Sequence, residues 1–360
     1  MRIRTLLLFL LCAALLATPA LAAELEESFG VDSVEEALPD SAARALDGLT
    51  AGEADMDSGL GRLWDYAMSR LKDTVRQVLR PVTAIVAITV LCSLISGMYG
   101  KEGINYVNLG GCAAVAAVAV GDVNSVAAMG GSTLAELSDF SKVLLPTLTT
   151  VAAASGAVTS ASAKYAAAAL FLDLLIQAAQ GLILPMICGY AACVIAGAAI
   201  GDGRLDAAAG LMKRLCKFLM TALVTCFTAY LTITGLVASG ADAAATKATK
   251  AVLTAALPVV GKLVSDASET LVAGAGLLRN TVGVFGLLAV LGVCVLPFLQ
   301  LGVRYLLFKA AAAVACAVSG DRLGRLIDGL GSVYGMVLGL VGTAAVFLYL
   351  SILSLIRTVT

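Results

Sequence analysis

Long stretches without a charged residue constrain this chain more than any other feature. Each is long enough to cross a bilayer, which takes about 20 apolar residues at 1.5 Å per residue. Inside the hydrocarbon only helices and closed barrels satisfy their own backbone groups, and runs of this length predict helices. The sequence therefore predicts an all-α polytopic membrane protein with six to eight transmembrane or re-entrant helices. The six uncharged stretches are Val82–Tyr99, Gly103–Gly121, Leu174–Gly201, Phe218–Ala241, Asn280–Val303 and Gly329–Ile356.

Composition narrows the function classes. A mean hydropathy of +0.95, with 60% hydrophobic and 14% charged residues, is typical of membrane proteins. The formal net charge of -1 gives no electrostatic footprint for nucleic acid. The chain has no histidine, which excludes catalytic triads and histidine metal sites. Phosphate-loop, zinc-protease and nucleophile-elbow motifs do not occur either. We expect no enzyme activity, no cofactor and no metal site.

The N-terminal residues predict export. Arg2 and Arg4 precede an apolar run from Leu6 to Leu16, and Ala20-Leu21-Ala22 provides a cleavage site, so residues 1–22 resemble a signal peptide. Residues 23–58 follow as an acidic extracytoplasmic arm, with eleven acidic residues and one basic residue between Glu24 and Asp57. This composition predicts a solvated, mobile segment that either docks a partner or serves as a plain linker.

Residues 59–80 predict an amphipathic helix. Apolar residues recur at helical spacing, and charged residues occupy the opposite face. An interfacial helix lying on the membrane is one interpretation, and a partner-binding helix is the other. Because basic residues here flank the first predicted span (81–102), the positive-inside rule would place them in the cytoplasm, whereas the signal peptide places them outside. We follow the signal peptide. The residues that mark this helix are Trp64, Arg70, Leu71, Lys72 and Arg76.

The rest of the chain shows signs of an internal duplication, with units at 103–215 and 216–330 and a final span at 331–360. Four Leu-Pro dipeptides recur in register at an offset of 112 residues, and Gly-Asp motifs recur near Gly201 and Gly320. Apolar segments broken by proline in repeated halves are typical of transporters with a site at the middle of the membrane. Whether the repeats are parallel or inverted is left open by the sequence. The predicted helix breaks are Pro146, Pro185, Pro258 and Pro297.

Two groups of residues are candidates for packing or for a pathway. Gly331, Gly335 and Gly339, joined by Gly342, form a ridge of small residues that lets helix backbones approach closely, within the chain or between copies. Hydroxyl side chains in the Val143–Ala163 segment either line a pathway or bond across packed helices; they include Thr149, Ser155, Thr159 and Ser160. Asp173 is interpreted as an interfacial carboxylate, and Lys309 as a side chain that snorkels to the membrane surface.

The overall pattern resembles the stage III sporulation protein AE family of endospore-forming bacteria. The resemblance is carried by the exported N-terminus, the acidic arm, the amphipathic helix, Arg80-Pro81 at the start of the first span and the Gly97-Met98-Tyr99-Gly100 loop. The repeated Leu-Pro and Gly-Asp segments extend it over nearly the whole chain. No single motif is diagnostic of the family, and it supplies no catalytic residues.

The resemblance implies a multi-pass subunit of the channel complex that joins mother cell and forespore. It implies a location in the mother-cell membrane around the forespore and partners among the other membrane proteins of the same complex. The bilayer is a further expected partner, as is a second copy of the chain, and nucleic acid is not. Two alternatives come from other classes: a secondary transporter with a midplane site between the repeats, and a membrane scaffold that anchors partner proteins.

Overall fold

The computed structural model describes residues 30–98, 101–201, 203–256, 260–319 and 321–357. The predicted signal peptide lies outside these ranges. Within them the chain is helical and contains no strand, and six helical rods are long and apolar enough to cross a membrane. The all-α prediction is confirmed. The rods are α4 (Met56–Met98), α5 (Lys101–Ala154), α6 (Val158–Ala178) with η2 (Ala179–Ile183) and α7 (Leu184–Ile200), α8 (Gly203–Ala256), α9 (Val260–Ser319) and α10 (Asp321–Ile356).

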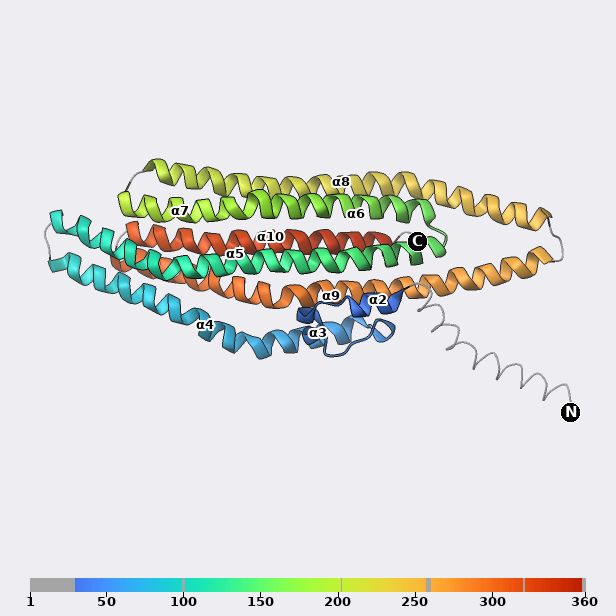
Figure 1. The fold of residues 1–360 in the computed structure, drawn as a ribbon, viewed down its shortest axis with the longest axis horizontal. Coiled ribbons are helices and arrows are strands. Elements are labelled where there is room, and N and C mark those ends of the chain that lie inside the picture. The colour runs from blue at the N-terminus through green and yellow to red at the C-terminus, as the bar shows by residue number, and fades with distance from the viewer. Residues whose placement is uncertain (1–29, 99–100, 202, 257–259, 320, 358–360) are drawn as a thin grey trace.

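The rods form an elongated bundle in which α9 and α10 lie centrally (Figure 1). Their facing surfaces hold much of the core, including Phe308 and Tyr334, whose rings meet edge to face at 4.7 Å. The α4–α5, α7–α8 and α9–α10 junctions gather at one end of the bundle, which we call the junction end. At 1.5 Å per residue the 60-residue α9 is about 90 Å long, so it extends well beyond a bilayer.

The connectivity bears on the orientation of the two predicted units. Each would correspond to a helical hairpin: α5 is followed by the α6–η2–α7 rod, and α8 is followed by α9. Because each hairpin returns the chain to the junction end, α5 and α8 run in the same direction. The two hairpins are therefore parallel, neither contains a re-entrant helix among the described residues, and the duplication itself stays a prediction. The Val143–Ala163 segment contains the end of α5, the turn at residues 155–157 and the start of α6, and Gly156 in this turn has a φ of 96° that favours glycine.

Proline does not break the helices where the sequence predicted it. Pro146 lies inside α5 and Pro297 inside α9, and both helices continue past them. In a bundle the one backbone bond that proline removes is compensated by neighbouring groups. Pro185 stands in the first turn of α7, directly after the π-helical turn η2. A wider turn of this kind relieves the clash of the proline ring with the preceding turn. Pro258 lies outside the described residues.

The acidic arm is packed where the sequence predicted a mobile linker. Residues 31–53 form α2 (Val31–Glu36), α3 (Asp40–Leu46) and the short 3-10 helix η1 (Ala51–Glu53). Val34, Leu46 and Leu49 are buried in the common core. Ser41 donates a hydrogen bond to the Glu136 carboxylate of α5 at 2.6 Å. Composition misled here because α5 and α9 provide surfaces that cover the few apolar residues of the arm.

The predicted amphipathic helix and the first predicted span form one continuous helix, α4. Pro81 lies inside it, so no corner exists at which residues 59–80 could turn to lie flat on a membrane. Leu63 and Val78 are buried against the bundle, whereas Trp64 is 65% exposed. The continuous α4 does not show a separate interfacial helix, and that interpretation stays a prediction. Only part of the apolar stripe packs on the bundle, because Leu60, Trp64 and Met68 are exposed.

Candidate functional site

A polar cavity of about 740 Å³ opens among α7, α8, α9 and α10, close to the junction end. The final turns of α7 and α9 and the first turns of α8 and α10 supply its walls. These α8 and α10 turns are the starts of long helices. The charged residues that line the cavity are Asp206, Lys213, Lys309, Arg322, Arg325 and Asp328.

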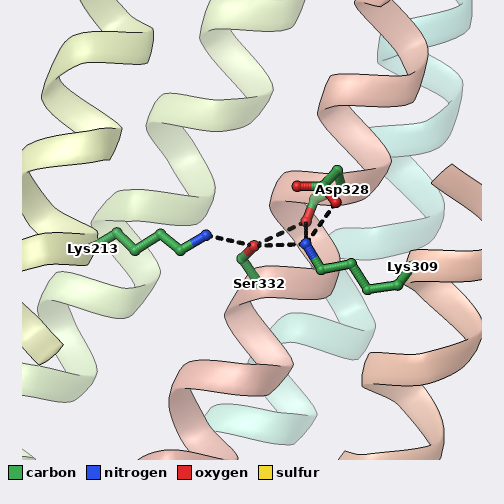
Figure 2. A network of polar contacts seen from close by, with 4 residues as sticks. All are labelled: Lys213, Lys309, Asp328 and Ser332. Carbon is green, nitrogen blue, oxygen red and sulfur yellow. Dashed lines mark hydrogen bonds and ion pairs between the residues drawn. The ribbon is translucent and has the colours of Figure 1, made fainter. Parts of the chain in front are cut away.

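Ser332 is the centre of a hydrogen-bond network at this cavity (Figure 2). Its Oγ accepts a hydrogen bond from Lys213 Nζ at 2.9 Å and another from Lys309 Nζ at 3.3 Å. It also donates to the Asp328 backbone carbonyl at 3.1 Å. Lys309 Nζ forms an ion pair with Asp328 Oδ1 at 2.6 Å. A serine hydroxyl offers one donor and two acceptor positions, so Ser332 is fully occupied between the two lysines.

Close helix packing places these charges side by side. A Cβ added to Gly329 of α10 would collide with Val194 of α7, and one added to Gly324 would collide with Cys316 of α9. Gly201, which ends α7 with a φ of 77°, lies directly against the Arg322 guanidinium. Only glycine leaves the room for these approaches and tolerates this backbone angle.

A second polar network lies deeper in the bundle. Arg304 of α9 pairs with Asp122 of α5 at 3.2 Å, and both side chains are nearly buried. The hydroxyl of Tyr334 on α10, a fully buried residue, donates a hydrogen bond to the other Asp122 oxygen at 2.7 Å. The network ties three helices together through the two oxygens of one carboxylate. It lines neither of the two described cavities.

The predicted glycine ridge meets different surroundings along its length. A Cβ at Gly335 would lie 3.1 Å from the Tyr305 ring, and one at Gly331 would lie 3.4 Å from Phe308, both on α9. Gly339 is exposed, and its nearest neighbour for such an atom is Met220 at 4.0 Å. Gly342 is similarly open, with Phe298 at 4.0 Å. These contacts support packing inside the chain at Gly331 and Gly335, and the role of the ridge stays a prediction.

The predicted pathway hydroxyls lie around the α5–α6 turn, away from both described cavities. Ser155 and Ser160 are buried, Thr149 is half-buried and Thr159 is exposed. Thr149 and Ser155 donate to backbone carbonyls of their own helix. Ser155 also accepts a hydrogen bond from the buried Arg279 at 3.3 Å. The structure thus brings Ser155 and Ser160 to the interior but does not gather the four residues around one space, and their role as a pathway stays a prediction.

Asp173 and Lys309 are the two remaining residues that the sequence singled out. Asp173 is exposed on α6 and accepts a hydrogen bond from Gln177 at 2.7 Å. Lys309 does not simply snorkel, since it is held by Asp328 and Ser332. Lys213, Ser332 and the Asp122 network were not predicted. Each of these polar residues stands near the end of an apolar run, which is the only local signal, because their partners are distant in the chain.

Comparisons with known proteins agree with the fold. The family model described as stage III sporulation protein AE matches residues 42–358. The chain is also similar to the stage III sporulation protein AE of Bacillus subtilis (strain 168), at 22% identity over 192 residues. That alignment covers 53% of this chain and 48% of the relative, about half of each. No solved structure matches the chain. Because the family match extends over most of the sequence, this multi-pass membrane protein belongs to the stage III sporulation protein AE family.

Proposed function

We propose that this chain is an integral subunit of the channel complex that connects mother cell and forespore, and that it forms part of the wall of an aqueous conduit. The observation that carries the proposal is a charged helix face beside the most apolar rod of the bundle. The exposed charged residues of this face, which we call the α4 face, are Arg62, Asp65, Arg70, Lys72, Asp73, Arg76 and Arg80.

Contacts between α4 and α9 indicate which part of α9 lies beside the α4 face. Gly59 packs against Leu288, and Ser93 donates a hydrogen bond to the Val318 carbonyl at 2.6 Å, so the two helices run in the same direction. The Asn280–Val303 stretch is the only uncharged part of α9 long enough to cross the hydrocarbon. The part of α4 from Arg62 to Lys72 then lies beside the second half of this stretch.

Exposed charges at this depth require water or a polar partner, because a charge facing hydrocarbon is costly. The arm also supports contact of this side of the bundle with water. Its helix α3 places Ala42 against Gly292 of α9, and Asp40 and Asp47 are exposed there. α8 shows the opposite character. It has no charge from Phe218 to Ala241, and Phe218, Tyr230 and Ile233 are exposed on it. A bundle with one lipid side and one aqueous side suits a subunit of a conduit.

Charge distribution supports an orientation in which the junction end faces the cytoplasm and the acidic arm lies outside. The first turns of α8 and α10 carry Arg204, Arg214, Arg322 and Arg325, the excess that the positive-inside rule associates with the cytoplasm. The basic residues of the α4 face are not a loop flank, since they lie along the side of the bundle. On this proposal they do not enter the positive-inside count, and they do not oppose the orientation that the signal peptide predicts.

The partners that fit this proposal are the other membrane proteins of the same complex, in the mother-cell membrane around the forespore. The transporter alternative predicts a cavity midway along the repeats, whereas the described polar cavity lies near the junction end. The scaffold alternative predicts no aqueous surface at bilayer depth. It would have to explain the α4 face in another way.

Reversing the charge of the α4 face tests the proposal. In the organism that encodes this chain, replacing Arg70, Lys72 and Arg76 together with glutamate is expected to lower the yield of heat-resistant spores by orders of magnitude. The reason is that three exposed cations which face the conduit or a partner there become anions. Protein level and membrane insertion should be unchanged, because exposed charges contribute about 0–1 kcal/mol to stability.

The matched control is the reversal of Lys142, an exposed lysine of α5 paired only with Asp139. It is expected to sporulate normally. Wild-type spore yield in the triple variant, with the protein inserted at its normal level, would contradict the proposal. Cross-linking in sporulating cells should also recover other membrane proteins of the complex with the wild-type chain but less of them with the triple variant.

A further inference from the structure

Among the described residues that line the junction-end cavity, cations outnumber carboxylates. They are Lys213, Lys309, Arg322 and Arg325 with Asp206 and Asp328, an excess of two positive charges. Asp328 is already engaged by Lys309. Among the described residues, neither Arg322 nor Arg325 has a hydrogen-bond or ion-pair partner. Lys213 has only the hydroxyl of Ser332, which it shares with Lys309 (Figure 2).

The cations form a defined site, because they come from three different helices and are held in place. Lys213 comes from α8, Lys309 from α9, and the two arginines from α10. Ser332 fixes the two ammonium groups, and the Gly201 turn supports the Arg322 guanidinium. Guanidinium groups bind phosphate oxygens in pairs, and ammonium groups add point charge, so this combination is typical of phosphate recognition.

We propose that this cavity binds a phosphate-bearing anion. A volume of about 740 Å³ accommodates more than one phosphate group, so the ligand is a phosphorylated small molecule or the headgroup of an anionic lipid. Both sources reach the cavity, because exposed Arg214 and Lys217 on the adjoining turns of α8 keep this end of the bundle out of the hydrocarbon. The proposal goes beyond the conduit proposal and does not depend on it.

The experiment uses the full chain in nanodiscs of phosphatidylcholine, with inorganic pyrophosphate as the soluble probe and phosphatidylglycerol as the lipid probe. Calorimetric titration is expected to show binding of at least one probe to one site per chain. Lys213→Gln and Arg322→Gln should each weaken it about tenfold, the usual effect of losing one charge-assisted hydrogen bond. Asp206→Asn should strengthen it, because a carboxylate of the wall is removed.

The controls are Arg214→Gln and Lys217→Gln, which remove exposed cations of the same helix that do not line the cavity. Each should change binding less than about twofold. Arg325→Gln provides a variant that does not threaten folding, since this side chain is exposed, and it too should weaken binding. Binding of pyrophosphate points to a soluble ligand, and binding of phosphatidylglycerol alone points to a headgroup. Absence of binding for both probes, or equal losses in the Arg214 and Lys217 controls, would overturn the proposal.

Discussion

Replacing Asp122 with alanine is expected to destabilise the bundle by about 3–5 kcal/mol, the cost of leaving a buried cation without its partner. Arg304 would lose its counter-ion at 3.2 Å, and the buried Tyr334 hydroxyl would lose its acceptor at 2.7 Å. The measurement is the apparent melting temperature of purified protein in detergent, together with the fraction recovered as a single species. The melting temperature and the recovered fraction should both be clearly lower than for the wild type.

Two comparisons make this result specific. Asp139→Ala removes an exposed carboxylate of the same helix, paired with Lys142 at 2.7 Å, and should change stability by less than about 1 kcal/mol. The double variant Asp122→Leu with Arg304→Met removes both charges and should be much less destabilised than the sum of the single variants, because no unpaired charge remains buried. Additive losses in the double variant would show that the two residues are not coupled.

Replacing Gly292 with leucine is expected to release the arm from α9. A Cβ at this position would lie 3.1 Å from the backbone Cα of Ala42 and 3.2 Å from its Cβ, and backbone cannot move aside as a side chain can. Overpacking of this kind costs about 1–3 kcal/mol. Since proteolysis follows the population of the open form, cleavage within residues 31–53 should accelerate by about ten- to a hundredfold.

Gly302→Leu is the matched control for the arm. It lies on the same helix, and no atom lies within 4 Å of an added Cβ. Its rate of arm cleavage should equal that of the wild type. If Gly292→Leu also left the rate unchanged, the arm would not be docked on α9 as the structure shows.

The uncharged runs predicted the helical class and the set of membrane-crossing rods, because backbone hydrogen bonding in hydrocarbon permits few alternatives. The ends of the helices were less predictable. Pro146 and Pro297 looked like breaks in the sequence, but the neighbours that compensate a lost backbone bond belong to tertiary structure. Likewise the acidic composition of residues 23–58 indicated solvation, and nothing local revealed that Val34 and Leu46 are buried, on helices that pack against α5 and α9 respectively.

The candidate site could not be predicted for a related reason. Asp122 meets Arg304 across 182 residues and Tyr334 across 212, and Lys213 meets Ser332 across 119. Each of these side chains looks like an ordinary charge or hydroxyl near the end of an apolar run. Periodicity reports which face of a helix is apolar, but it carries no information on which distant helix completes a polar contact. Only the packing of α5 and α8 against α9 and α10 brings these groups together.

Thiol labelling of intact cells tests the account most directly, because its central claim is that the α4 face meets water at the depth of the α9 span. In a background with all nine cysteines replaced, single cysteines would be placed at Glu36, Arg70, Gly203 and Ile233, all exposed positions. A membrane-impermeant reagent added outside is expected to label positions 36 and 70, to label 203 only after permeabilisation, and to leave 233 unlabelled throughout. An unlabelled cysteine at position 70 beside a labelled one at position 233 would contradict the account.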